Sequence, residues 1–430
     1  MSRPAAPPAA RALPVAGAAA PPPFVLPGEH FAAALTWLVI GCAGLIAVAP
    51  ALAAGDFLGP RVFAVTHVFS LGVVATSIFG ALLQLFPVTM GVGARSLRLA
   101  HASFWAMVAG TATIVAGFWF WSGWAQAAGW LLVFLAVGGV SWNLLPQRRR
   151  ATDGRLIGLF VAAGHSALGL AMALGLARIA DTLGWWRFDR IGSLVAHYHL
   201  GVFGFATLTA AGVGSRMLPM FMLSHGYPEW PLRRLLYVAS AGHLLFAVGM
   251  PFHLRWLSLP GAMLLAAAGG LYLYQVFAYF RARTRKKLDA GLAHVAAAFV
   301  ALSLAVAAGL ALALAPHTSH PSLWVAYALL GLLGWLVLLV IGIYYKILPF
   351  LTWLHRFGAK MGEPDVPTVA DLTKPAWAWT SLVLLTAGVV VLVSGVALGS
   401  VAAARAGAIA FTAGAGFVVA QHLRIYTAHR

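Results

Sequence analysis

Three histidines stand early in two long apolar segments, and their side chains are suited to binding a metal ion or a haem. His67 lies in the apolar segment that ends near Pro87, while His197 and His199 lie in the one that ends near Pro219. Imidazole is a common ligand of iron, copper and zinc. An imidazole inside a membrane segment is costly unless it is satisfied. Three of them at related positions therefore predict a bound cofactor.

The spacing of these histidines sets what they can do together. At ~1.5 Å per helical residue, all three lie roughly 8–12 Å below one membrane surface, a depth that suits a haem held between helices by two axial imidazoles. Two residues apart on a helix is about 200° of rotation, so His197 and His199 point to nearly opposite sides. The register predicts that His67 pairs with His199, and it leaves His197 for a second cofactor or a polar network. The alternative is that all three are packing histidines, hydrogen-bonded to hydroxyls or backbone.

The segment that carries His197 and His199 occurs twice more in altered form. The three copies end at prolines that lie 132 and 130 residues apart, namely Pro87, Pro219 and Pro349. His67 and His199 both stand twenty residues before the proline of their copy, and Leu329 takes this position in the third copy. Self-similarity at a near-constant period predicts a tandem repeat.

The composition excludes an ordinary soluble domain. Of 430 residues, 61% are hydrophobic and 9% are charged, and the mean hydropathy is +0.88. We expect an all-α integral membrane protein with twelve transmembrane helices. The predicted spans are 31–53, 62–86, 100–121, 126–145, 156–178, 191–215, 235–254, 259–280, 291–315, 322–346, 377–398 and 407–426.

The twelve spans divide into three tandem four-helix units, which predicts a pseudo-threefold arrangement within one membrane domain. The units cover residues 30–150, 151–288 and 289–430, and a Pro/Ala-rich cytoplasmic tail over residues 1–29 precedes them.

The basic residues predict the orientation of the chain. All but six of the 28 lysines and arginines lie in the two tails or in the loops after even-numbered spans. The positive-inside rule then places both termini in the cytoplasm, in a bacterial-type inner (plasma) membrane. The net charge of +18 reflects this topology and contact with the lipid bilayer, and does not indicate a nucleic-acid partner.

Two further candidate sites carry weaker signals. His243 lies in the middle of the seventh span and is a possible metal ligand. A group of soft ligands for copper stands at the end of the sixth span and comprises Met217, Met220, Met222 and His225. Methionines at a helix end more often pack than bind copper. Copper therefore remains open but unsupported.

The pattern of helices and histidines resembles two families of membrane proteins. Three arcs of four helices, with a single His on one helix and a His-x-His on an equivalent helix, resemble the catalytic subunit (subunit I) of the haem–copper oxidase superfamily. The His-to-Pro spacing and the HLGVFGF run from His199 are similar to the NnrS family of haem- and copper-containing membrane proteins, which is linked to nitric oxide tolerance. The resemblance implies that His67, His197 and His199 bind haem iron.

The chain also departs from the oxidase pattern. Span seven, AGHLLFAVGMPFHLRW, lacks the adjacent histidine pair of the oxidase copper site, and span ten has no histidine. We therefore expect a haem-b membrane protein, with one or two haems, that handles electrons or a diatomic gas such as nitric oxide and has a redox partner. Whether it is an oxidoreductase stays undecided. The alternatives are a membrane transporter and a non-catalytic subunit of a membrane complex.

Overall fold

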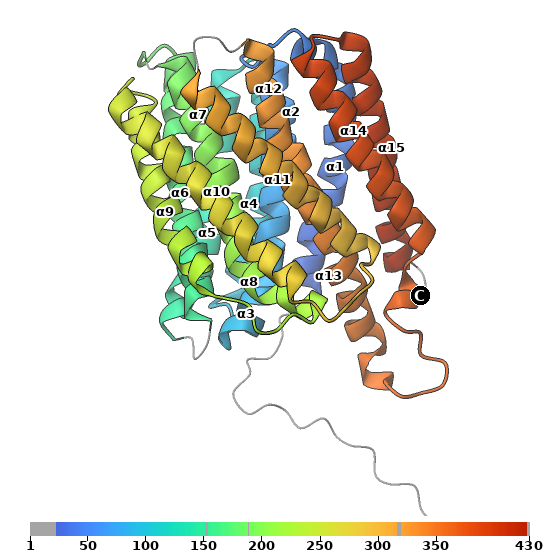
Figure 1. The fold of residues 1–430 in the computed structure, drawn as a ribbon. Helices are drawn as coiled ribbons and strands as arrows, with labels where there is room; N and C mark the ends of the chain where they lie inside the picture. Colours follow the sequence, from blue (N-terminus) through green and yellow to red (C-terminus); the bar gives the residue numbers. More distant parts are fainter. Residues whose placement is uncertain (1–22, 151–153, 188, 316–319, 428–430) are drawn as a thin grey trace, which may run out of the picture.

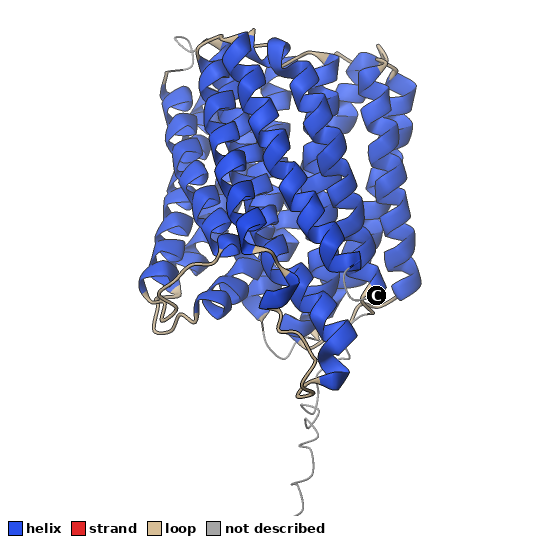
Figure 2. Ribbon diagram, turned by 90° about the vertical axis from the view of Figure 1, so that its right-hand side faces the viewer, coloured by secondary structure: helices blue, strands red, loops and turns tan. Residues whose placement is uncertain are grey.

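The computed structural model of the chain describes residues 23–150, 154–187, 189–315 and 320–427. Helices make up the regular structure of these residues, and no strand occurs among them (Figure 2). The helices form one bundle and lie side by side (Figure 1). The predicted all-α membrane architecture is confirmed at this level. Most of the predicted tail lies outside the described residues, and its last five residues belong to the first helix, which begins at Val25.

Most spans are uninterrupted α-helices. Their bounds are α1 (Val25–Ala53), α4 (Leu97–Trp119), α5 (Gly123–Leu144), α6 (Arg155–Thr182), α9 (Trp230–Gly249), α10 (Arg255–Arg281), α11 (Ala290–Leu314), α14 (Pro375–Ala397) and α15 (Val401–Thr427). Short 3₁₀ turns, η2 (Leu145–Arg149), η6 (Gly358–Lys360) and η7 (Ala370–Leu372), lie in the connections.

Eleven helical spans among the described residues are long and apolar enough to cross a membrane. They coincide with eleven of the twelve predicted spans. The remaining span is α9, which packs along α10 but opens with the polar sequence WPLRR and falls short in mean hydropathy.

The spans that carry the histidines are interrupted helices. Each consists of an α-helix, eight residues of π-helix and a second α-helix. They are α2 (Pro60–His67), η1 (Val68–Ala75) and α3 (Thr76–Met90); α7 (Arg190–His199), η3 (Leu200–Thr207) and α8 (Leu208–Met222); and α12 (Pro321–Leu329), η5 (Leu330–Val337) and α13 (Leu338–Phe357).

The π-helical segments begin directly after His67, His199 and Leu329, the three register-matched residues. A π-turn has i→i+5 hydrogen bonds, is rare, and is frequently found at functional sites. The hydroxyls of Thr76 and Thr207 donate to carbonyls five residues earlier, each at 2.9 Å, and so support the wide turns. The three π segments contact one another, so the histidines lie beside the meeting point of the three helices.

A glycine in each π segment lets another span approach closely. Gly72, Gly204 and Gly334 all stand fifteen residues before the proline of their copy. A Cβ atom on these glycines would lie 2.5 Å from Trp37 of α1, 2.7 Å from Ala167 of α6 and 2.9 Å from Ala301 of α11, respectively. The same close helix–helix contact, typical of small residues in membrane bundles, thus recurs three times.

The bundle has two ends, which we name by their residues. The basic face carries Arg148–Arg150 and the loop after α10, with its RARTRKK sequence from Arg281. The opposite face carries the α6–α7 and α9–α10 connections, which include Asp189 and His253.

Replacing Gly204 by Ala should destabilise the protein, because the new methyl group would clash with the Cβ of Ala167, which is fixed on a helix. Overpacking of this kind costs about 1–3 kcal/mol. Thermal unfolding of the full chain in detergent measures the effect as a lower Tm. The matched control is Gly201→Ala in the same π segment, where no atom lies within 4 Å of the added Cβ. Equal Tm values for the two variants would contradict the close contact.

Candidate functional site

His67 and His197 lie beside each other in the structure. His67 is the last residue of α2, His197 lies near the end of α7, and their ring centroids are 6.2 Å apart with an interplanar angle of 36°. Phe118 of α4 packs against His67 at 4.8 Å between centroids. Residues from three spans therefore meet at this point.

Hydrogen bonds determine which nitrogen each ring presents. Nδ1 of His67 bonds the carbonyl of Phe63 at 2.8 Å, and Nδ1 of His197 bonds the carbonyl of Ala171 on α6 at 2.7 Å. A carbonyl can only accept, so the proton resides on Nδ1 and Nε2 keeps its lone pair, as in metal-binding histidines.

The distance between the two rings suits a shared metal ion. With metal–nitrogen bonds of about 2.0–2.1 Å, two imidazoles on opposite sides of one ion have centroids roughly 6 Å apart. The observed 6.2 Å matches this spacing. The described residues contain no cluster of three or more His, Cys, Asp or Glu side chains that could hold an ion by themselves.

His199 faces the other side of the interrupted helix. Its Nδ1 bonds the carbonyl of Val195 at 2.7 Å, so its Nε2 accepts a hydrogen bond from the hydroxyl of Tyr327 at 2.9 Å. Its ring packs on Phe246 of α9 at 4.5 Å. His197 and His199 do point to different sides, as their spacing predicts. The structure does not bring His67 to His199, however, because His199 is engaged with α9 and α12.

A large cavity lies on the side of His199. It has a volume of about 480 Å³ and lies among the α7–η3–α8 span, α9, α10, α11 and α12. Its walls are mostly apolar. Its polar lining includes His199, Thr207, His243, Tyr272 and Tyr327 inside, and Asp189, His253, Arg255 and Ser258 toward the opposite face.

His243 has an unpartnered nitrogen in this cavity wall. Its Nδ1 bonds the carbonyl of Ala239 at 2.8 Å, and its Nε2 is buried with no hydrogen-bond partner. A buried nitrogen without a partner carries a free-energy cost and needs an explanation. His243 and His199 thus line one cavity, to which neither His67 nor His197 contributes.

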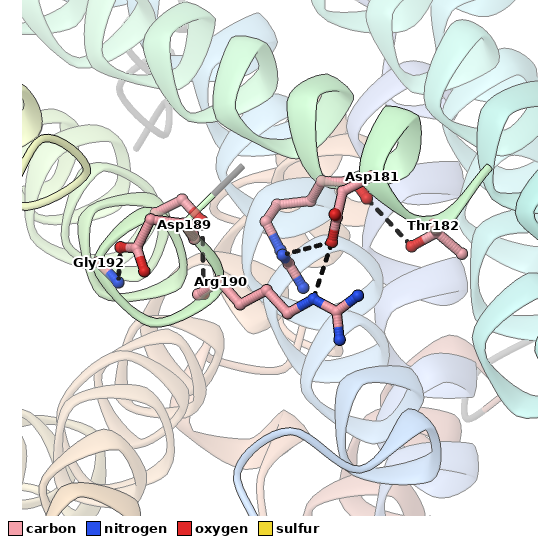
Figure 3. A network of polar contacts seen from close by, with 7 residues as sticks. Asp181, Thr182, Asp189, Arg190 and Gly192 are labelled. Carbon is pink, nitrogen blue, oxygen red and sulfur yellow. Dashed lines mark hydrogen bonds and ion pairs between the residues drawn. The ribbon is translucent and has the colours of Figure 1, made fainter. Parts of the chain in front are cut away.

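Charged residues hold the start of α7 in place (Figure 3). The carboxylate of Asp181 accepts from Arg178 at 3.3 Å and from Arg190 at 2.9 Å. Asp189 caps α7 by accepting from the backbone N–H of Gly192 at 2.6 Å. The entry of the helix is thereby held in place by two carboxylates and two guanidiniums.

The members of the methionine group considered for copper differ in exposure. Met217 and Met222 are buried, but Met220 is 52% exposed. His225 is exposed, and its Nδ1 lies 3.2 Å from the carbonyl of Leu223. Two members of the group are thus buried and two are exposed, and copper binding there stays a prediction.

Tyr327 is the site residue that sequence reasoning missed. It stands twenty-two residues before Pro349, which is the position of His197 relative to Pro219. The repeat register thus contained the signal, but a search restricted to histidines passes over a tyrosine.

No protein-family model matches the chain, and no curated protein sequence matches it.

Replacing Tyr327 by Phe should lower stability by about 1–3 kcal/mol, because Nε2 of His199 would lose its donor inside the bundle. Thermal unfolding in detergent measures the change. Tyr237→Phe, at a position that is 71% exposed, is the matched control and should leave Tm unchanged. An unchanged Tm in Tyr327→Phe would contradict the stabilising role of this hydrogen bond.

Proposed function

We propose that this chain is a haem-binding integral membrane protein that handles electrons or a diatomic gas such as nitric oxide. The observation that carries the proposal is the His67–His197 pair, whose rings are 6.2 Å apart. In each ring Nδ1 carries the proton and donates it to a carbonyl, so the lone pair of Nε2 is available to a ligand.

His67 and His197 are the proposed axial ligands of the first haem. Bound haem would supply one-electron redox chemistry. The carbonyls of Phe63 and Ala171 orient the two rings and raise the basicity of Nε2. Arg178 lies close enough to His197 to act on it electrostatically, and its guanidinium suits the carboxylate groups of a haem. Two imidazole ligands leave no open position, which favours electron transfer at this site.

The cavity beside His199 is the proposed second site. Its volume of about 480 Å³ lies within the usual range for cofactor pockets and could hold a second haem. Either His199 or His243 would hold it, which leaves a position for a gas, and the hydroxyl of Tyr327, which now donates to His199, could instead donate to that gas. The unpartnered Nε2 of His243 supports this assignment.

We further propose that the chain is built from three four-helix units, with both termini in the cytoplasm of a bacterial-type inner membrane. The recurrent π segments and their glycine contacts support the repeat. The basic loops support the orientation. A redox partner would then approach one of the two faces.

The haem should be visible in the absorption spectrum of the purified protein, with a Soret band and a low-spin bis-imidazole signature after expression with ample haem. His67→Ala and His197→Ala should each lose the low-spin signal, because each removes one axial nitrogen. His199→Ala should keep it, because this ring faces the other side.

His101→Ala is the control. His101 of α4 already has a partner, because its Nδ1 lies 2.8 Å from the carboxylate of Glu29 on α1. Colourless protein would count strongly against the proposal. Retention of the low-spin signal in both His67→Ala and His197→Ala would refute the ligand pair.

Rapid four-electron reduction of oxygen should be absent. The helix α9 carries His243 without an adjacent histidine, so the three-histidine copper site of oxidases is incomplete. Oxygen-electrode assays with a reduced artificial donor test this point. Cyanide-sensitive turnover at the rate of a terminal oxidase would overturn it.

A further inference from the structure

A second, smaller cavity lies among the three helices that follow the π segments. We call it the central cavity. It has a volume of about 100 Å³ and lies between α3, α8 and α13, with Phe31 of α1 and Tyr272 of α10 completing its wall. Most of its lining is apolar, and Leu82, Val213 and Ile343 are examples from the three helices.

Apart from the hydroxyl of Tyr272, the polar groups in this wall are engaged with the protein or directed away from the cavity. The hydroxyls of Ser77 and Tyr344 bond each other at 2.5 Å, and Ser77 also donates to the carbonyl of Val73. The hydroxyl of Thr209 lies toward Gly164 of α6, where a Cβ would be 2.5 Å away from it. With so few polar partners available, water gains little by entering this cavity.

One side chain belongs to the walls of both cavities. Tyr272 lines the 480 Å³ cavity and the central cavity. Its ring is 3% exposed and stands edge-on to Phe299 at 5.3 Å and to Trp335 at 6.0 Å. Its hydroxyl lies 3.7 Å from the Cβ position of Gly214, in the wall of the central cavity. The ring of Tyr272 thus forms a partition between the two spaces.

We propose that the central cavity is a holding site for a small apolar gas, and that the gas exchanges with the larger cavity past the ring of Tyr272. A dry apolar cavity of about 150 Å³ in another protein takes up benzene or xenon, so a space of about 100 Å³ accommodates a diatomic molecule. The proposal that gas occupies the central cavity depends only on the volume and lining of that cavity. The exchange rests on the proposed function, because it assumes a haem in the larger cavity.

Xenon tests occupancy, because it binds dry apolar cavities without any haem. We expect xenon in the central cavity of the full chain, detected in xenon-pressurised crystals. Gly214→Leu should abolish this xenon site, because the added side chain fills space next to Tyr272. The Cβ at this position meets no atom closer than 3.7 Å, so the variant should fold.

Gly416→Leu is the matched control, a helical glycine on α15 with no atom within 4 Å of its Cβ. It should retain the xenon. Absence of xenon from the wild-type cavity, or unchanged xenon in Gly214→Leu, would overturn the holding site.

Carbon monoxide photolysis on the reduced, haem-loaded protein tests the exchange. Tyr272→Ala should slow geminate rebinding, because photolysed gas escapes more readily into the central cavity. Gly214→Leu should have the opposite effect, and Gly416→Leu should have none. Unchanged rebinding in both Tyr272→Ala and Gly214→Leu would refute the exchange. A protein without haem that still binds xenon would refute the proposed function and leave the holding site intact.

Discussion

The hydrogen bond between a histidine Nδ1 and a backbone carbonyl is the interaction on which the candidate site depends. In the membrane interior an unsatisfied imidazole is expensive, and this bond satisfies one nitrogen while it fixes the tautomer. His67, His199 and His243 all use the carbonyl four residues earlier in their own helix. Each ring then presents Nε2 away from its helix, where it can reach a ligand or a partner on another span.

His197 is the exception, and its difference explains the pairing. Its Nδ1 bonds the carbonyl of Ala171 on α6 instead of its own helix. Gly175, one turn further along α6, lies against the ring, and a Cβ there would make an ordinary contact of 3.4 Å with Cε1 of His197. The bond draws the ring toward α6 and places it beside His67. Asp189 caps the start of α7 and so fixes the position of the helix that carries His197.

The π segments separate the histidine ends of the spans from the ends that surround the central cavity. Each wide turn adds a residue and shifts the face that the following α-helix presents. Because η1, η3 and η5 meet one another, the central cavity lies beyond them among α3, α8 and α13. The larger cavity lies beside them. The two cavities thus share a wall at Tyr272, whose ring is held by Phe299 and by Trp335 of η5.

Local hydropathy and the period of a helix were enough to predict the membrane class, eleven of the spans and the orientation of His197 and His199 toward different sides of their helix. The sequence by itself could not decide which neighbour each face meets, since that depends on how distant spans pack around one another. Only the tertiary structure placed His197 with His67, brought His243 and Tyr327 to the cavity of His199, and revealed the π segments. The π geometry has no clear signature in an apolar run, because it satisfies the backbone nearly as well as the α-helix and is selected by packing.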